Sequence, residues 1–212
     1  MKKITEKDKS RWKSFILNEA NYSIPQHCRG GICVDAGTNI GDFPLKHGKR
    51  FDKYICYDVF QENVDECIKN TENLGVPVQV YKRAVWDRPN EDVEVYAYQH
   101  RSLGLDHFGN SGNVGCIKEV GEFGEGWSKD NIIDKVPSIT LEEIIAEYGE
   151  INLLKIDVEC SEYPFLLGKD LSKVNYIVGE MHRGREEQSE LIDWLKKFDK
   201  FNPACWVSQF RS

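Results

Sequence analysis

The sequence predicts an α/β fold with a mostly parallel twisted sheet and helices on both faces. Short apolar runs alternate along the chain with segments that have helical periodicity. Several of these runs are apolar throughout, which is typical of parallel strands buried on both faces. The 212 residues suffice for one sizeable α/β domain.

The first apolar run, Ile32–Val34, is followed by a sharp turn and by a helix that we expect from Asp42. Gly37 and Gly41 lack a Cβ atom, so the backbone can turn tightly and approach a ligand there. Asn39 is the residue type that best tolerates positive φ after glycine. The alternative is an ordinary strand-to-helix turn.

A second strand, Tyr54–Asp58, precedes a helix over Glu62–Leu74 and a third strand over Val78–Arg83. Asp58 follows the first strand's aspartate by 23 residues, which is close to the spacing of a βαβ unit. A carboxylate there can accept two hydrogen bonds from the vicinal hydroxyls of a ribose, or it can cap the following helix. Ala84 and Val85, after the third strand, can line an adenine pocket or pack in the core.

The middle of the chain is less regular. Asp92–Tyr98 alternates apolar and polar residues and predicts an antiparallel strand. Residues 100–134 are rich in Gly, Ser and Asn, and we expect a lid or an insertion there. Arg101 and Trp127 of this loop are candidates for contact with an acceptor substrate.

Regular structure is expected to resume near Pro137, with a capping box at Thr140 and Glu143 that opens a helix. The remaining predictions are strands over Ile151–Asp157 and Val174–His182, helices near 164–167 and over 186–198, and one or two closing strands in 201–210.

Acidic residues and one histidine stand at the ends of the predicted strands. Because the carboxyl ends of parallel strands meet at one edge of a sheet, we expect these side chains to lie together. Glu180 and His182, two residues apart, should share one face of their strand. The set comprises Asp35, Asp58, Asp157, Glu159, Glu180 and His182.

The domain organisation expected is an N-terminal helical segment with a linker over 1–30 and a single domain over 31–212. The net charge of −7 argues against nucleic acid as the partner, since phosphate binding needs clustered Lys and Arg. Seven cysteines without a Cys-x-x-Cys pair favour a reducing compartment. With no long apolar stretch and no signal core, we expect a cytoplasmic protein that does not bind membranes.

An ordered set of short motifs in this chain resembles the FkbM-type family of S-adenosylmethionine-dependent methyltransferases. The resemblance runs from about residue 31 to residue 182. Its motifs are Val34–Gly41, Tyr57-Asp58 with Asn63 and Asn70, Ala84-Val85, Ser138–Glu142, Leu154–Glu159 with Glu162, and Glu180-x-His182. Two positions depart from the family pattern, because Cys160 stands where glycine is usual and Asp58 where glutamate followed by proline is usual.

The resemblance implies a class I methyltransferase (Rossmann-like) fold, S-adenosylmethionine as the cofactor and methylation of an oxygen, often a hydroxyl of a sugar or natural product. Asp35, Gly37, Asn39 and Gly41 would wrap the methionine portion, Asp58 would hold the ribose, and Val85 would lie near the adenine. The remaining cofactor positions would be Ala36, Thr38, Val59, Ala84 and Asp157. The acceptor would be a small molecule or a glycan.

Transfer to a hydroxyl benefits from a nearby base. His182 is the first candidate because its ordinary pKa lies near neutrality, followed by Asp157 and Glu159, while Glu180 is a candidate for contact with the substrate. We assign no metal, although these four residues could alternatively hold a divalent ion.

Two other functions stay open. An NAD-dependent oxidoreductase shares the strand–turn–helix unit, but it would need a phosphate-binding turn where this chain has an aspartate. A catalytically inactive binding module with the same fold is the second alternative.

Overall fold

The computed structural model describes residues 22–98, 114–117, 132–159, 161–182 and 185–208. Six strands form one sheet in the order β10-β9-β8-β1-β2-β3, and every neighbouring pair is parallel. Their bounds are Ile32–Ala36 for β1, Lys53–Asp58 for β2, Val78–Lys82 for β3, Ile151–Ile156 for β8, Val174–Met181 for β9 and Trp206–Ser208 for β10. The predicted Rossmann-like α/β fold is confirmed.

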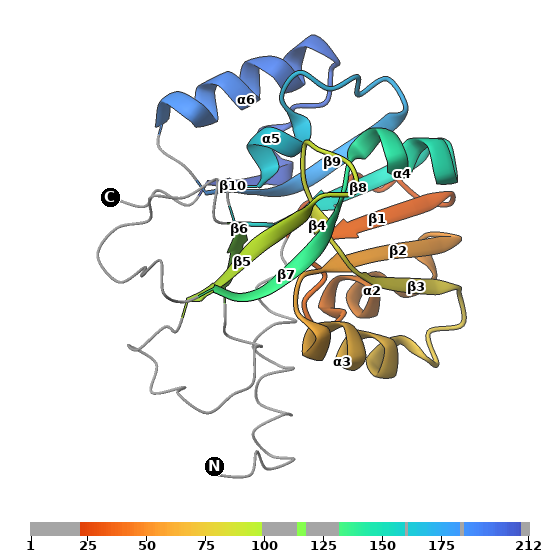
Figure 1. Cartoon of the computed structure of the whole chain (residues 1–212). Coiled ribbons are helices and arrows are strands. Elements are labelled where there is room, and N and C mark those ends of the chain that lie inside the picture. The colour runs from red at the N-terminus through yellow and green to blue at the C-terminus, as the bar shows by residue number, and fades with distance from the viewer. Residues whose placement is uncertain (1–21, 99–113, 118–131, 160, 183–184, 209–212) are drawn as a thin grey trace.

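Helices cover both faces of this sheet (Figure 1). On one face lie α2 (Asp42–His47) and α3 (Gln61–Thr71), with a short 3-10 turn at Gly48–Arg50 after α2. The other face carries α4 (Leu141–Tyr148), α5 (Glu162–Leu166) and α6 (Arg185–Lys197), and a second 3-10 turn, Pro203–Cys205, precedes β10. None of the helices in the described ranges is long and apolar enough to cross a membrane.

The central strands are buried because helices cover both of their faces. In β1 the residues from Cys33 to Ala36 are buried, and in β8 every residue except Asn152 is. The apolar core therefore runs along the middle of the sheet, as the continuous apolar runs predict. Its largest fully buried side chains include Phe43, Phe51, Tyr54, Tyr57 and Phe165.

A second sheet, in the order β4-β7-β5-β6, lies beside the large one (Figure 1). It comprises β4 (Ala84–Val85), β5 (Asp92–Tyr98), β6 (Val114–Ile117) and β7 (Ile132–Ile139). The predicted antiparallel strand over Asp92–Tyr98 is confirmed, since β5 pairs antiparallel with both β6 and β7. A buried apolar cluster that includes Val93, Val95 and Val136 holds this sheet together.

The prediction of an irregular loop over residues 100–134 is wrong at two places. Residues 114–117 form β6, and β7 begins at Ile132 rather than near Pro137. Both segments are strands because they pair with β5, and such pairing with a distant partner leaves little trace in the local sequence pattern. The rest of this predicted loop lies outside the described residues.

The chain before β1 packs against the domain from Tyr22 onward. Tyr22 and Cys28 are buried in the main core. Arg50 holds the backbone of this segment, because its guanidinium donates to the carbonyl oxygens of Cys28 at 2.8 Å and Ile24 at 3.3 Å. The helical segment expected at the start of residues 1–30 falls before Tyr22, outside the described part of the chain.

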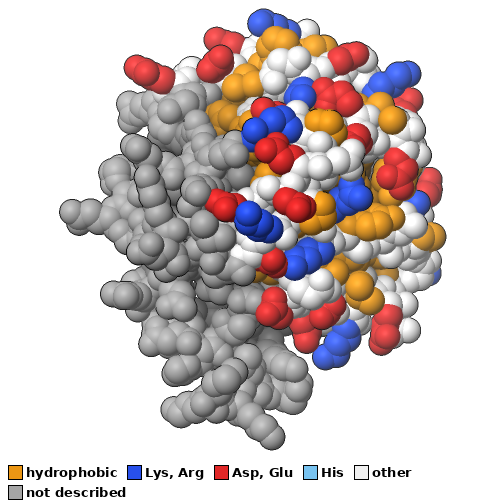
Figure 2. All heavy atoms as spheres, in the orientation of Figure 1, with side chains coloured by type: hydrophobic (Ala, Val, Ile, Leu, Met, Phe, Trp, Pro, Cys, Tyr) orange, Lys and Arg blue, Asp and Glu red, His pale blue; other side chains and the backbone are white. Residues whose placement is uncertain are grey.

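The described part of the face in Figure 2 carries acidic and basic side chains interspersed with apolar ones. Basic side chains on it are separated from one another by acidic or neutral ones.

Candidate active site

The turn after β1 has the backbone that its sequence predicts. Gly37, Asn39 and Gly41 have φ angles of 76°, 50° and 85°. A Cβ atom on Gly37 would lie 1.8 Å from the backbone oxygen of Asp157, which follows β8. The loops after β1 and β8 therefore touch at a point where only glycine fits. They meet where the strand order reverses, which is where open α/β sheets bind their ligands.

The backbone N–H groups of this turn are already used inside the protein. Those of Gly37 and Thr38 donate to the carbonyl oxygen of Tyr57 at 2.9 and 3.0 Å, and that of Gly41 donates to Thr38 at 2.9 Å. The Asn39 N–H donates to a carboxylate oxygen of Asp58. These four N–H groups are therefore not available to cradle a phosphate.

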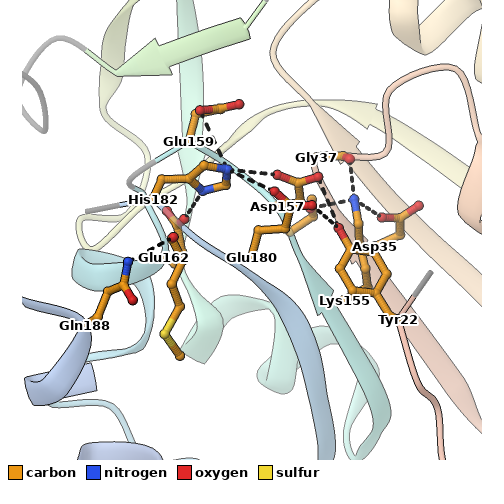
Figure 3. A network of polar contacts seen from close by, with 12 residues as sticks. Tyr22, Asp35, Gly37, Lys155, Asp157, Glu159, Glu162, Glu180, His182 and Gln188 are labelled. Atoms are coloured by element: carbon orange, nitrogen blue, oxygen red, sulfur yellow. Dashed lines mark hydrogen bonds and ion pairs between the residues drawn. The ribbon is translucent and has the colours of Figure 1, made fainter. Parts of the chain in front are cut away.

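Asp35 lies beneath the turn and is fully buried. Its Oδ2 accepts a 2.7 Å hydrogen bond from the Thr38 hydroxyl, and its Oδ1 lies 3.1 Å from the Nζ of Lys155 (Figure 3). Thr38 is also fully buried. In this arrangement Asp35 supports the turn from below, and its direct contact with a cofactor stays a prediction.

Lys155, the fifth of the six residues of β8, is a buried cation that the sequence analysis missed. Its ammonium donates to the carbonyl oxygen of Gly37 and ties β8 to the turn after β1. Burial opposes its charge, but the carboxylates of Asp35, Asp157 and Asp42 together raise the pKa of Lys155 above its ordinary value. A lysine directly after the apolar pair Leu153-Leu154 was the available signal, because a buried charge needs a partner.

Asp58, at the end of β2, is held by three donors. Its Oδ1 accepts from the Phe60 N–H and the Asn63 amide, both at 3.0 Å, and its Oδ2 accepts from the Asn39 N–H at 2.9 Å. Burial raises the pKa of Asp58 to about 6, against the lowering effect of these hydrogen bonds. Since a carboxylate oxygen accepts about two hydrogen bonds, Oδ2 keeps room for one further donor. Asp58 also accepts the N–H of Phe60, the residue just before α3, and its contact with a ribose stays a prediction.

Four carboxylates surround the imidazole of His182, which follows β9 (Figure 3). Its Nδ1 bonds Glu162, the first residue of α5, and both side chains are almost completely buried. Its Nε2 faces the other three acids, at 3.4 Å from Glu180, 3.5 Å from Asp157 and 3.7 Å from Glu159. Three of the five acids expected to lie together, Asp157, Glu159 and Glu180, therefore meet at His182, whereas Asp35 and Asp58 have other partners. Glu162 is an inner partner to which the sequence analysis assigned no role.

The charges around His182 decide its protonation. Burial alone would lower its pKa, but the carboxylates, Glu162 first among them, raise the pKa of His182 well above its usual range. A histidine that keeps its proton at neutral pH has no free nitrogen lone pair to accept another. The role of His182 as the general base stays a prediction, and this electrostatic environment favours a carboxylate instead.

Tyr22 joins the site from the segment before β1. Its buried hydroxyl donates to Asp157 Oδ2 at 3.2 Å and lies 3.5 Å from Glu180 Oε1. Its ring packs 6.2 Å from that of Phe43 in α2. The sequence analysis placed this residue in a linker, and no local pattern marks its contact with residues more than 130 positions later.

The remaining predicted positions are distributed around this centre. Ala36 is fully buried at the end of β1, and Ala84 and Val85 are buried in β4. Val59 packs against the core of the small sheet. Arg101, Trp127 and Cys160 lie outside the described residues.

Comparison with known proteins gives one family. The profile of the family described as "Methyltransferase FkbM domain" matches residues 35–201. No curated protein matches the chain. Among solved structures, the YcgJ protein from Bacillus subtilis is similar at 15% identity and a TM-score of 0.26, over 39% of this chain and 35% of that chain. This chain thus spans about a third of that structure's length, and so low a score carries no argument about function.

Proposed function

This chain belongs to the FkbM methyltransferase domain family, and we propose that it transfers a methyl group from S-adenosylmethionine to a hydroxyl oxygen of a sugar or natural product. The carrying observation is the meeting of the turn after β1 with the acidic ends of β8 and β9. Such a site suits a cofactor with a sulfonium cation, because a group of carboxylates favours positive charge.

The cofactor's parts have candidate partners along the sheet edge. The glycine turn lets the backbone of residues 37–41 approach the methionine portion. Asp58 Oδ2 has one described donor and can accept a second hydrogen bond, which one ribose hydroxyl would donate. Val85 of β4 would border the adenine. When bound, S-adenosylmethionine supplies the electrophilic methyl group, and the residues around it orient the acceptor in line with sulfur.

The acceptor would meet this edge near Asp157, Glu159 and Glu180. Their side chains are 31%, 17% and 15% exposed, whereas that of His182 is 1% exposed. One of these carboxylates is therefore better placed to take the hydroxyl proton. Such proton transfer contributes roughly 10²–10⁴-fold to a rate. The motif that follows β8 begins Asp-Val-Glu rather than with the Asn-Pro-Pro-Tyr of nitrogen methyltransferases, which favours oxygen as the acceptor.

The NAD-dependent alternative loses support from the turn itself. A pyrophosphate needs free N–H groups at the start of a helix, and four N–H groups of the turn are already used. Asp35 lies beneath the same turn. A catalytically inactive binding module stays a second candidate, because it would keep the same fold.

Calorimetry with S-adenosylmethionine and S-adenosylhomocysteine tests the proposal. We expect both to bind and Asp58→Asn to weaken binding about 10- to 100-fold, since a hydrogen bond to a charged group contributes about 1.5–3 kcal/mol. Glu62→Gln, an exposed change on the neighbouring helix, should bind as the unaltered protein does. No binding at millimolar concentration would refute cofactor use. Transfer of a labelled methyl group to sugar acceptors separates an enzyme from a binding module.

For the location of the protein we propose the cytoplasm. The supporting observation is a set of buried free thiols, which are typical of a reducing compartment. They are Cys28, Cys33, Cys56, Cys67 and Cys205.

A further inference from the structure

We propose that Asp157, Glu180 and His182 form a binding site for a divalent transition-metal ion at the carboxyl edge of the large sheet. Each of the three offers one ligand atom, and these atoms all lie within 4.8 Å of one another. They come from the ends of two adjacent parallel strands, β8 and β9. A rigid pair of strands is the kind of support that keeps ligand positions fixed.

The histidine is oriented as a metal ligand would be. The bond from Nδ1 to the fully buried Glu162 fixes the ring, and Nε2 is the nitrogen that faces the carboxylates (Figure 3). Metal-bound histidines almost always donate their second nitrogen to a carboxylate, a carbonyl or water. Glu162 supplies this outer contact from α5, an element that contributes no ligand.

The two carboxylates are oriented in the same way, by Tyr22. Its hydroxyl faces Asp157 Oδ2 and Glu180 Oε1. The other oxygen of each carboxylate, Asp157 Oδ1 and Glu180 Oε2, faces His182 Nε2. Each of the three side chains therefore has one atom held by an outer residue and one atom directed toward a common point.

The spacing of these atoms fits a metal ion. With bonds of about 2.0–2.2 Å to nitrogen and oxygen, neighbouring ligands of a tetrahedral ion lie about 3.4 Å apart. His182 Nε2 lies 3.4 Å from Glu180 Oε2 and 3.5 Å from Asp157 Oδ1. The ligands therefore need little movement to close around an ion, and a fourth position would face the open side of the site.

Charge also favours a cation here. Asp157, Glu159, Glu162 and Glu180 all lie within 4.0 Å of one imidazole. A metal ion at Nε2 replaces the proton that these carboxylates hold on His182 in its absence, since histidine binds metals in its neutral form and metal binding releases protons. One nitrogen with two oxygens suits Mn²⁺ or Zn²⁺ better than Mg²⁺, because imidazole is a poor ligand for Mg²⁺. A bound ion could stabilise the oxygen of a hydroxylated acceptor.

Metal binding is tested without cofactor or acceptor, so its failure is distinct from failure of the proposed methyl transfer. The full chain is stripped with a chelator, dialysed, and titrated with Mn²⁺ while free Mn²⁺ is followed by electron paramagnetic resonance. We expect one Mn²⁺ per chain, displaced by stoichiometric Zn²⁺ and not by an equal amount of Mg²⁺. Absence of binding at millimolar Mn²⁺ and Zn²⁺ would overturn the proposal.

Variants assign the site. Asp157→Asn and His182→Gln should each weaken Mn²⁺ binding more than about 100-fold, and Tyr22→Phe, an outer contact, about 10- to 100-fold. Glu190→Gln, an exposed acid on α6, should leave binding unchanged. Circular dichroism checks that each variant folds. If a ligand variant does not fold, the affinity of Tyr22→Phe for Mn²⁺ tests the site instead, because this variant keeps the buried ring. Unchanged affinity in the folded variants would overturn the site.

Discussion

Individual buried charges determine the shape of this site. Asp35 and Lys155 are both almost fully buried, and their pairing joins β1 to β8 at the turn that we assign to the cofactor. Lys155 additionally contacts the carbonyl oxygen of Gly37. Removing either residue would leave the other as a buried charge without a partner, which is strongly destabilising.

We expect Lys155→Met to destabilise the protein by about 3–5 kcal/mol, since it leaves Asp35 buried without its counter-charge. Urea denaturation measures the change in the free energy of unfolding. The double variant Asp35→Asn with Lys155→Met should recover part of the loss. Lys196→Met serves as the control, because its exposed pair with Asp193 should contribute little. An equal effect of both single substitutions would contradict a special role for the buried pair.

Asp42, the first residue of α2, should make stability depend on pH. Burial raises its pKa to about 7, assisted by Asp35 and Asp157 and opposed by Lys155. Between its unfolded pKa of about 3.9 and about pH 7, the folded state binds more protons than the unfolded state. Stability from this group therefore falls as pH rises through that range and levels off above it. Asp58, with its pKa raised to about 6, acts in the same direction.

The matching measurement is denaturation at a series of pH values. Asp42→Asn should reduce the loss of stability between pH 5 and pH 7.5. Asp65→Asn, on the exposed side of α3, should keep the original pH dependence. If Asp42→Asn left that dependence unaltered, the raised pKa would not describe the folded protein.

At the scale of elements, the site depends on contact between the ends of β1 and β8. Asp157 donates its N–H to the carbonyl oxygen of Ala36 at 3.0 Å, and its own carbonyl oxygen occupies the place where a side chain on Gly37 would be.

The predicted capping box of α4 is formed, since Thr140 Oγ1 accepts from the Glu143 N–H and the Glu143 side chain accepts from the Thr140 N–H. The two residues of the capping box are only three positions apart, so the sequence pattern alone predicts their contact.

Gly37→Ala should abolish cofactor binding and destabilise the fold, because its Cβ would lie 1.8 Å from the backbone oxygen of Asp157. Gly168→Ala is a matched control, since Gly168 has the same φ of +76° but no atom within 4 Å of the added carbon. The control therefore reports only the backbone strain, about 1–2 kcal/mol. Comparable losses in thermal stability and in calorimetric affinity for the two variants would argue against the close contact.

For the molecule as a whole, the site is assembled from residues 22 to 182. The segment before β1 is part of the domain, because Tyr22 is buried in its core and reaches the acids at the ends of β8 and β9. The boundary that we expected at residue 30 therefore divides residues that pack together, although the organisation of the full chain stays a prediction.

Arg50→Leu should release this segment, because the guanidinium bonds the carbonyl oxygens of Ile24, Pro25 and Cys28. Limited trypsin digestion should then cut faster after the exposed Arg29. Lys49→Met, one residue away and exposed, is the control and should digest at the original rate. Unchanged cleavage in Arg50→Leu would mean that other contacts hold the segment.

The sequence by itself determined the strand–turn–helix unit, the positive φ angles at Gly37, Asn39 and Gly41, the capping box at Thr140, and the family. Each of these depends on interactions between near neighbours or on ordered motifs. Only the tertiary structure decided the pairing of Lys155 with Asp35, the orientation of His182 by Glu162, the contact of Tyr22 with Asp157, and the strands β6 and β7. These contacts join groups that are far apart along the chain, and such groups interact only after the folded sheet has brought them together.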